Sequence, residues 1–565
     1  MGKRVLVVGG VAGGMSTAAR VRRLDEDAEV IVFEKGEHVS FSNCCLPYHL
    51  SDEIPCGDTL VLMSPKEIKE QYNLDVRVHH EVVKINREEK TIEVRDLQED
   101  KTFTESYDKL VLSTGAKARK LPIEGIEIVP VFPLRNVANA KGIHDTIVNN
   151  NLKNIVVIGG GFIGVEAAEN LRLRGCNVTI VELAEQILMT LDHDMVQIVQ
   201  GEILNQGIDL HVGTSLEKIE NNTAYLSNGK TAPCDLLVMS AGLIPESGLA
   251  EEAGLELTER KYIKVDQNYL TSDPDIYAIG DVIPVFYRIS GVFAPLQLAG
   301  PAQKQARFVA DHIYGKYTMN TGYLGSSAIK VFDYNAAATG LTVSMLERLG
   351  WPNYDYVYLI PKDSVGIMPS SRNQFLKVVF EIPTGRILGA QAVGKGDVVK
   401  RIDVIAAMLK FQPTLEDLKD LELCYAPPFN IARDSVNFAG YVGLNILHGV
   451  YKHVHVSDVR GLVEEGAYIL DVREVHEYEK GHIKNAINLP LSELRERMEE
   501  IPKDKPVYLH CRSSQRSYNA IMALQHKGWN NLYNIDGSFL GLSHHEYFLD
   551  KTTGRESILT EYNFA

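Results

Sequence analysis

Lys3-Arg4-Val5-Leu6-Val7-Val8-Gly9-Gly10-Val11-Ala12-Gly13-Gly14 begins the chain with an apolar run that ends in a glycine-rich turn. An amphipathic helix pattern follows through about Leu24, and a second apolar strand runs from Glu29 to Glu34. Strand, glycine turn, helix, strand and a terminal acidic residue are typical of a βαβ unit that binds a dinucleotide. The glycines let backbone N–H groups approach a pyrophosphate, and the Glu34 carboxylate can accept from a ribose hydroxyl. Val11 replaces the middle glycine of the usual pattern, so this motif alone could also be only a tight turn.

The pattern recurs about 150 residues later, with all three glycines, in Ile155-Val156-Val157-Ile158-Gly159-Gly160-Gly161-Phe162-Ile163-Gly164. A strand from Asn177 to Glu182 follows, and no arginine lies near its end to receive a 2′-phosphate. Glu182 therefore predicts NADH rather than its phosphorylated form. Two such units form an internal repeat and predict two bound dinucleotides. The alternative is that one site is used and the other is vestigial.

Composition limits the class of protein. The chain has 565 residues, which favours three to four domains, with 45% hydrophobic and 23% charged residues. A net charge of −16 argues against a nucleic-acid binder, which needs a basic face. No apolar run reaches the roughly 18–20 residues of a membrane span. Seven cysteines without a C-x-x-C pair indicate a reducing cytoplasm and free thiols.

Short strand-end signatures add a family resemblance. They are Leu112-Ser113-Thr114-Gly115-Ala116, Met239-Ser240-Ala241-Gly242 and Thr271-Ser272-Asp273-Pro274-Asp275-Ile276-Tyr277-Ala278-Ile279-Gly280-Asp281. With the two glycine turns, residues 1–445 resemble the two-dinucleotide-binding flavin reductases (the pyridine nucleotide-disulfide oxidoreductases), in which the first unit holds FAD and the second NAD(P)H. The resemblance implies that Asp281 contacts the ribityl chain of the flavin, whereas a helix N-cap is the structural alternative. The implied cofactor residues are Gly9, Val11, Ala12, Gly13, Gly14, Glu34, Lys35, Thr114, Gly115, Asp281, Gly159, Gly161, Phe162, Ile163, Gly164, Glu182 and Gly242.

The stretch Ser40-Phe41-Ser42-Asn43-Cys44-Cys45-Leu46-Pro47-Tyr48 supplies the candidate redox thiol. The chain lacks C-x4-C here, and a disulfide between the adjacent Cys44 and Cys45 would need a strained ring. Cys44 should therefore act alone and pair with an external thiol or with oxygen. The phrase resembles the coenzyme A-disulfide and persulfide reductases, which implies that Ser40 and Asn43 flank the thiol. The same resemblance implies that Arg20 and Arg23 meet coenzyme A phosphates; a solvated helix face is the alternative.

The segment 321–446 has mixed strand and helix patterns and resembles the dimerisation domain of that family. It contains Leu423-Cys424-Tyr425-Ala426-Pro427-Pro428-Phe429, where two prolines impose an extended backbone. The resemblance implies that Tyr425 reaches the active cysteine of a partner subunit. A buried core tyrosine is the alternative.

A new α/β pattern begins near residue 452 and resembles a rhodanese domain. It includes Tyr468-Ile469-Leu470-Asp471-Val472-Arg473-Glu474, Gly481-His482-Ile483 and Val507-Tyr508-Leu509-His510-Cys511-Arg512-Ser513-Ser514-Gln515-Arg516-Ser517. Cys511 and Arg516 frame a C-x4-R loop, one residue shorter than the C-x5-R loop that fits phosphate. A shorter ring of N–H groups before a helix suits a thiolate or persulfide. Ser514 stands where the family usually has glycine, and a domain used only for docking is the alternative.

Together these features predict an α/β protein with two Rossmann-like domains, an α+β dimerisation domain and a C-terminal rhodanese domain. We expect residues 1–115 with 245–320 to bind FAD, 116–244 to bind NAD(H), 321–446 to dimerise and 452–565 to form the rhodanese domain. The predicted activity is NADH-dependent reduction of a persulfide, polysulfide or coenzyme A disulfide in a cytoplasmic homodimer, with no metal site. Two alternatives stay open: an NADH oxidase or peroxidase that cycles through a sulfenic acid, and a flavin-containing redox sensor or docking protein.

Overall fold

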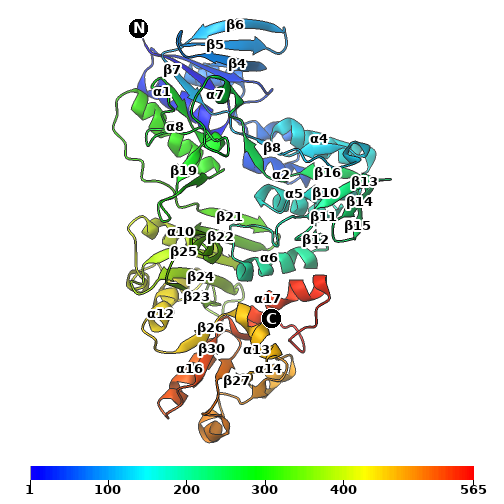
Figure 1. The fold of residues 1–565 in the computed structure, drawn as a ribbon, viewed down its shortest axis with the longest axis vertical. Helices are drawn as coiled ribbons and strands as arrows, with labels where there is room; N and C mark the ends of the chain where they lie inside the picture. Colours follow the sequence, from blue (N-terminus) through cyan, green and yellow to red (C-terminus); the bar gives the residue numbers. More distant parts are fainter. Residues whose placement is uncertain (1, 565) are drawn as a thin grey trace. The chain divides into compact units, whose positions relative to one another are not determined.

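The computed structural model describes residues 2–564 and has a mixed α/β fold, as predicted (Figure 1). It divides into two compact units, one of residues 1–185 with 211–323 and one of residues 186–210 with 324–565. Among the described residues, no helix combines the length and the apolar character that crossing a bilayer requires.

The first unit contains a five-stranded parallel sheet built around the N-terminal apolar run. Its strand order is β18-β7-β1-β2-β3, with Val5 opposite Val30 and Val8 opposite Leu112. β-Branched residues fill the two central strands, which are buried almost throughout, as expected when helices cover both faces. The strands are β1 (Arg4–Val8), β2 (Glu29–Glu34), β3 (Asp75–Val78), β7 (Lys109–Leu112) and β18 (Ile276–Ala278), and α1 (Ala12–Leu24) packs with α8 (Ala299–Ile313).

A second parallel sheet in this unit repeats the arrangement. Its strands β11 (Asn177–Val181), β10 (Asn154–Ile158), β16 (Leu236–Met239) and β9 (Val131–Pro133) lie in that order. Helix α5 (Phe162–Leu173) connects β10 to β11 as α1 connects β1 to β2. The predicted internal repeat is therefore confirmed, with both helices starting directly after the glycine turns.

The second unit begins with an antiparallel sheet of order β21-β22-β25-β24-β23. Its strands are β21 (Ser327–Val331), β22 (Tyr334–Gly340), β23 (Tyr354–Leu359), β24 (Gln374–Glu381) and β25 (Ile387–Gly394). Helices α6 (His193–Asn205), α10 (Val398–Leu409) and α12 (Ser435–Leu447) pack against it.

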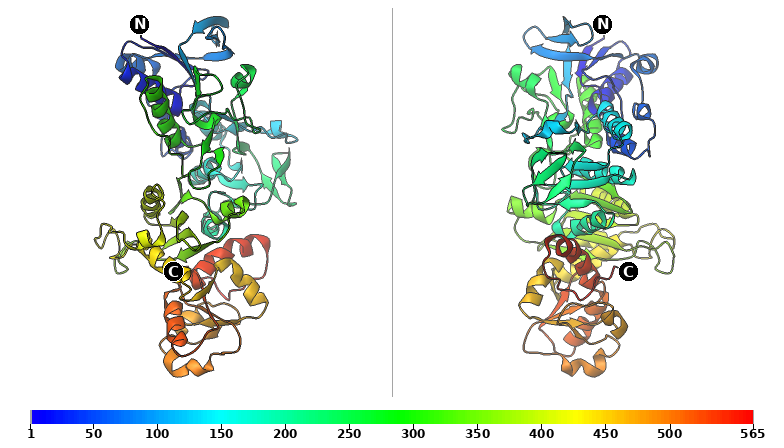
Figure 2. Two further views of the ribbon diagram at one scale, coloured as in Figure 1. Left: turned by 60° about the vertical axis from the view of Figure 1, so that its left-hand side comes forward. Right: turned by 90° about the vertical axis from the view of Figure 1, so that its right-hand side faces the viewer.

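The C-terminal part of this unit is a five-stranded parallel sheet of order β26-β30-β29-β27-β28, visible in orange and red in Figure 2. Its strands are β26 (Lys452–Val454), β27 (Tyr468–Asp471), β28 (Ile487–Asn488), β29 (Val507–His510) and β30 (Leu532–Ile535). The main helices are α13 (Val459–Glu464), α14 (Val475–Glu479), α16 (Gln515–Gln525) and α17 (Ser538–Thr553). Helix α17 packs on α6, and the Cβ of a residue placed at Gly537 would lie 2.5 Å from the Tyr358 ring, so only glycine fits this contact.

Candidate active site

The first glycine turn is shaped to leave backbone N–H groups available. Gly9 has a φ of +104°, and a Cβ on Gly14 would lie 1.8 Å from the Gly9 carbonyl oxygen. Glycine is therefore required at both positions. Helix α1 starts at Ala12 with no side-chain cap, so the donors of its first turn have no side-chain acceptor there. Such a helix start suits the diphosphate of a dinucleotide.

The second glycine turn has nearly the same geometry. Gly159 has a φ of +103°, and a Cβ on Gly164 would lie 1.9 Å from the Gly159 carbonyl oxygen. Gly161 caps α5, again without a side-chain hydrogen bond, and no atom lies within 4 Å of the place of its Cβ. Val11 holds the matching position in the first turn. Helix α1 starts directly after Val11, as α5 starts directly after Gly161.

The two predicted ribose acceptors, Glu34 and Glu182, also hold these turns. Glu34 accepts hydrogen bonds from the backbone N–H of Gly10 (2.8 Å) and of Gly36 (2.8 Å). Glu182 likewise accepts from Gly160 (2.6 Å) and Ala184 (2.7 Å). A carboxylate has about four acceptor positions, so each can still bind a hydroxyl. The residues present therefore fit a dinucleotide at each turn.

Other predicted cofactor residues lie at the carboxyl ends of neighbouring strands. The Thr114 hydroxyl donates to the Glu246 carbonyl oxygen (2.7 Å), and Gly115 has a φ of +72°. Lys35 forms an ion pair with the Glu246 carboxylate at 2.7 Å. Gly242, with a φ of +88°, accepts a backbone hydrogen bond from Arg119. Thr114 and Lys35 therefore both contact Glu246, whereas Gly242 contacts Arg119.

Asp281 lies in the short 3-10 helix η4 (Gly280–Val282), whose N-cap is Ile279. The N-cap alternative for this residue is therefore wrong. Burial raises the pKa of the Asp281 carboxyl, while Arg135, whose Nη2 is 3.6 Å from the Asp281 Oδ2, opposes the rise. Arg135 was not predicted from the sequence, because it is far from Asp281 along the chain and belongs to no motif.

The Ser40–Tyr48 stretch is fixed at its start and leaves its thiol accessible. Ser40 has a φ of +50° and donates its N–H to the Gly10 carbonyl oxygen, while Phe41 pairs with Val61. Asn43 and Cys44 lie in the 3-10 helix η1 (Asn43–Cys45), followed by α2 (Leu46–Leu50). Cys44 is exposed, and both it and Cys45 are free thiols.

Acidic groups surround Cys44. Partial loss of hydration raises the pKa of its thiol, and the charges of Glu166, Cys45 and Asp281 raise that pKa further. Burial, helped by Glu169, raises the pKa of Glu166 itself to about 7. Glu166 was missed in the sequence, although it lies only five residues after Gly161 on α5. The structure thus brings Cys44 and Asp281 into one electrostatic environment and adds Glu166.

The four predicted substrate residues have different surroundings. Arg20 binds the buried carboxylate of Asp311 through Nε (2.9 Å) and Nη2 (2.6 Å). Arg23 is exposed, with its guanidinium 5.7 Å from the centre of the Tyr72 ring. Asn43 directly precedes Cys44, and Ser40 lies four residues before it. The Arg20 guanidinium is thus already paired with a carboxylate of α8, whereas that of Arg23 is more accessible to an anion.

The second unit contains the other predicted thiol. Cys511 is buried, and the Ser517 hydroxyl lies 3.8 Å from its Sγ. Ser514, in the usual glycine position, takes the left-handed conformation with a φ of +73°, and its hydroxyl donates to the Ile535 carbonyl oxygen. Helix α16 begins directly after it without a side-chain cap. The loop therefore keeps a glycine-like path although it has a serine.

Arg516 is held at this loop by Glu477. Two hydrogen bonds of 2.6 and 2.8 Å join its guanidinium to the Glu477 carboxylate. They lower the pKa of Glu477 to about 2 and, together with the charge of Cys511, raise the pKa of Arg516.

Tyr425, elsewhere in the second unit, has 50% of its surface exposed, so the alternative of a buried core tyrosine is wrong.

Three protein-family models match successive segments of the chain, in the order expected from the sequence. Residues 3–306 match the family "Pyridine nucleotide-disulphide oxidoreductase", and residues 326–435 match its dimerisation domain. Residues 455–545 match a "Rhodanese-like domain".

Individual relatives are similar over long stretches. The coenzyme A disulfide reductase of Staphylococcus haemolyticus is 33% identical over 440 residues, which cover 78% of this chain and 99% of the relative. The crystal structure of reduced Bacillus anthracis CoADR-RHD is 41% identical with a TM-score of 0.93, covering 98% of this chain and 99% of that one. An NAD-dependent persulfide reductase from A. fulgidus is 33% identical with a TM-score of 0.89, covering 95% and 99%.

Proposed function

Because the chain belongs to the pyridine nucleotide-disulphide oxidoreductase family, we propose that it is an FAD-dependent, NADH-consuming reductase of persulfides, polysulfides or coenzyme A disulfide. The observation that supports this most directly is the combination of that family with a rhodanese-like domain on one chain. This chain matches 99% of the length of the coenzyme A disulfide reductase and 99% of the length of the persulfide reductase named above. The free, unpaired Cys44 agrees with a single redox cysteine that reacts with an external sulfur carrier.

The division of labour along the chain follows from the same reasoning. Residues 1–115 with 245–320 form the FAD-binding domain, and residues 116–244 bind NADH. Residues 321–446 form the dimerisation domain of a homodimer, and residues 452–565 handle sulfane sulfur. The acidic net charge and the free thiols are compatible with a cytoplasmic enzyme.

The first glycine turn and Glu34 would hold FAD, with Asp281, Thr114 and Gly115 at the neighbouring strand ends. The second turn and Glu182 would hold NADH. When bound, FAD supplies the two-electron chemistry that connects NADH to sulfur. Backbone N–H groups at the two helix starts would bind the diphosphates, while the carboxylates of Glu34 and Glu182 would bind ribose hydroxyls.

Cys44 supplies the thiol that forms a mixed disulfide or a persulfide with the substrate. Thiol exchange needs the attacking sulfur as a thiolate, and Glu166 and Asp281 disfavour that charge. Protonation of Glu166, with a pKa of about 7, would therefore ease formation of the thiolate. Ser40, Asn43, Arg23 and Arg20 would contact a coenzyme A substrate, and Tyr425 would reach Cys44 of a partner subunit.

Cys511 takes or hands over sulfane sulfur as an enzyme persulfide. Arg516 provides positive charge at the loop, and Glu477 fixes its guanidinium. The pantetheine arm of coenzyme A could carry sulfur between the two cysteines. The products of the reductase step are hydrogen sulfide and a thiol.

Two cysteine variants test this proposal. Cys44→Ser should abolish reduction of every sulfur acceptor while leaving flavin reduction by NADH intact, measured by anaerobic stopped-flow absorbance at the flavin band. Cys511→Ser should spare disulfide reduction but lower turnover with thiosulfate or polysulfide. Flavin that is reoxidised by peroxide or oxygen and not by persulfide would contradict the proposal and favour an oxidase. Equal loss of both activities in Cys511→Ser would contradict the division of labour.

A further inference from the structure

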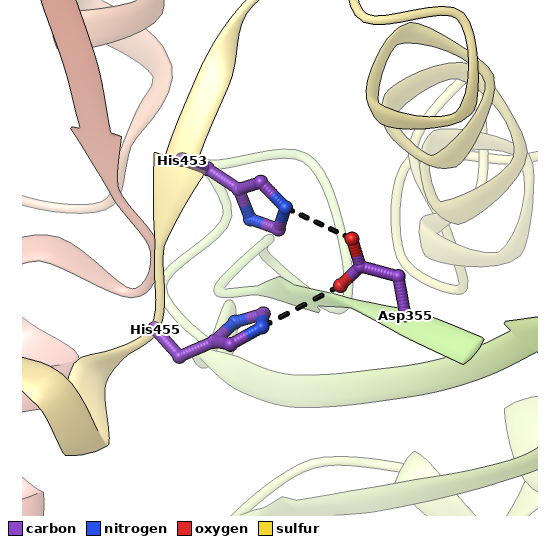
Figure 3. Close-up of side chains that lie close together, drawn as sticks. All are labelled: Asp355, His453 and His455. Atoms are coloured by element: carbon purple, nitrogen blue, oxygen red, sulfur yellow. Dashed lines mark hydrogen bonds and ion pairs between the residues drawn. The ribbon is translucent and has the colours of Figure 1, made fainter. Parts of the chain in front are cut away.

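Two histidines and an aspartate lie close together at the start of the C-terminal sheet. They belong to other stretches of the sequence than Cys44 and Cys511. His453 lies on β26 and His455 follows two residues later, so their side chains point to the same side of the extended backbone. Asp355, on β23, faces both rings (Figure 3). Its Oδ2 lies 3.1 Å from the His453 Nε2, and its Oδ1 lies 3.4 Å from the His455 Nε2. One ligand atom from each of the three residues falls within 4.8 Å of the others.

A second carboxylate lies on the opposite edge of the two rings. Asp536, directly after β30 and buried, has its Oδ2 2.7 Å from the His453 Nδ1 and 3.3 Å from the His455 Nδ1. The His453 contact is a hydrogen bond, whereas the His455 Nδ1 makes none. Asp536 therefore orients His453 directly and keeps negative charge beside His455. Histidines that bind metals usually donate their second ring N–H to a carboxylate in this way.

This arrangement creates a need for a cation. If Asp536 holds the His453 Nδ1 as a donor, the His453 Nε2 presents a lone pair to the Asp355 carboxylate. This lone pair and the Asp355 oxygen repel each other unless positive charge lies between them. A proton on the imidazole can supply this positive charge. A divalent cation satisfies the same charge, because two carboxylates balance it with both imidazoles neutral.

We propose that Asp355, His453 and His455 form a binding site for Zn²⁺ or a similar first-row divalent cation, with Asp536 orienting His453. Two imidazole nitrogens and one carboxylate are a donor set that zinc accepts, and a water molecule can complete four-coordination. Each imidazole Nε2 lies within 3.4 Å of one Asp355 oxygen, a separation that each histidine and the carboxylate could keep as two ligands of a tetrahedral ion with bonds of about 2.0–2.1 Å. The side chains of Asp355, His453 and His455 are 20%, 11% and 25% exposed, so an ion can enter from solvent.

The site would join two parts of the second unit. Asp355 belongs to the antiparallel sheet, while His453 and His455 begin the C-terminal sheet. The Asp355 carboxylate is already positioned, since its Oδ1 accepts from the N–H of Tyr356 (2.7 Å), whose ring stacks on His455 at 3.8 Å. Binding would require the ligand atoms, which lie within 4.8 Å of one another, to close around the ion. No metal site was expected from the sequence. Asp355 and His453 are 98 residues apart and form no motif, so their proximity could not be predicted.

Zinc binding to the full-length, FAD-loaded protein tests the proposal. After treatment with EDTA, equilibrium dialysis at about 10 µM free Zn²⁺ with metal analysis should give one ion per chain. X-ray absorption at the zinc edge should show only nitrogen and oxygen neighbours at about 2.0–2.1 Å. A sulfur shell at about 2.3 Å would place the ion on cysteines and overturn the proposal, and so would a protein that binds no zinc. This measurement uses the unmodified chain and does not depend on the folding of any variant.

Matched variants identify the ligands. His453→Gln, His455→Gln and Asp355→Asn should each lose the bound ion, whereas His526→Gln, at an exposed histidine of α16's C-cap, should keep it. Asp536→Asn should weaken binding by about 10–100-fold, as loss of an orienting carboxylate does. FAD content and flavin reduction by NADH verify that each variant is folded. Unchanged zinc in the His453→Gln, His455→Gln double variant would show that the ion binds elsewhere and that protons alone hold this cluster.

Discussion

Replacing Glu166 by glutamine should stabilise the protein in alkaline solution and have little effect in acid. The Glu166 carboxyl has a pKa of about 7 instead of 4.5, because it is buried and lies near the charge of Glu169. At about 1.4 kcal/mol per pKa unit, ionising it in the folded protein costs about 3 kcal/mol more than in the unfolded chain. The folded state holds this proton to higher pH than the unfolded state does. Stability should therefore fall between about pH 4.5 and pH 7 and stay lower above that range.

Thermal unfolding of the FAD-loaded protein, followed by flavin fluorescence, measures this effect. Glu166→Gln should unfold roughly 6–12 °C above the parent at pH 8, taking about 2–4 °C per kcal/mol for a domain of this size. At pH 5 the two midpoints should nearly coincide. Glu217→Gln, which removes an exposed carboxylate on β13 (Leu216–Glu220), should have no such pH-dependent effect. Equal or lower stability of Glu166→Gln at pH 8 would show that the charge of Glu166 is not buried as described.

The same substitution should change the reactivity of Cys44. Since the negative charge of Glu166 raises the pKa of the Cys44 thiol, its removal should lower that pKa. Alkylation of Cys44 by iodoacetamide at pH 8 should become faster, as quantified by mass spectrometry of the peptide. The rate should respond little at pH 5, where Glu166 is protonated in the parent as well. A rate unchanged at both pH values would separate Glu166 from the thiol.

Two further predictions concern the second unit. Lys377→Met should destabilise it by about 3–5 kcal/mol, because the loss of the buried ammonium leaves two carboxylates unpaired. This ammonium lies 3.1 Å from the Asp192 carboxylate and 2.9 Å from that of Asp194. The midpoint of urea unfolding measures the loss, and adding Asp194→Asn should recover part of it. Glu477→Gln should lower the thermal midpoint at pH 7 by the equivalent of about 1 kcal/mol, since the partly exposed pair with Arg516 is screened by solvent. Because this pair lowers the pKa of Glu477 from 4.5 to about 2, its stabilisation is complete above about pH 4.5 and disappears toward pH 2. A deficit of Glu477→Gln that persists at pH 2 would contradict that assignment, and its thiosulfate turnover should fall if Arg516 is mispositioned.

The parts of the fold that depend on local pattern were accessible from the sequence. The strand predicted from Glu29 to Glu34 is observed with those bounds, and the helix before it ends at Leu24 as expected. These elements are specified by a continuous apolar run, a glycine turn and helical periodicity, all of which are read within about 30 residues. The C-x4-R loop was visible for the same reason. Its serine at position 514 left the backbone path undetermined until the left-handed conformation was seen.

Residues that act through tertiary contacts were not accessible in this way. Arg135 meets Asp281 and Glu477 meets Arg516 only after distant segments pack together. Glu34 and Glu182 show an intermediate case, since their position after the second strand predicted a ribose acceptor but not their hydrogen bonds to the glycine turns. A carboxylate that holds a turn and one that binds a ligand have the same spacing in the sequence. The backbone geometry shows that both carboxylates hold their glycine turns, and each keeps acceptor positions for a ligand.

The two cysteines differ in a way that supports separate tasks. Cys44 is exposed, and the acidic groups near it raise the pKa of its thiol, so that the protonated thiol is favoured over the thiolate. Binding of substrate or protonation of Glu166 changes the local charge and makes the thiol more reactive. Cys511 is buried in a loop, away from solvent, and its charge contributes to the raised pKa of the Arg516 guanidinium. A persulfide is most useful when it is held as an anion away from water, whereas an exchanging thiol must be reachable. The surroundings of Cys511 therefore suit storage of sulfane sulfur, and those of Cys44 suit brief exchange with a carrier.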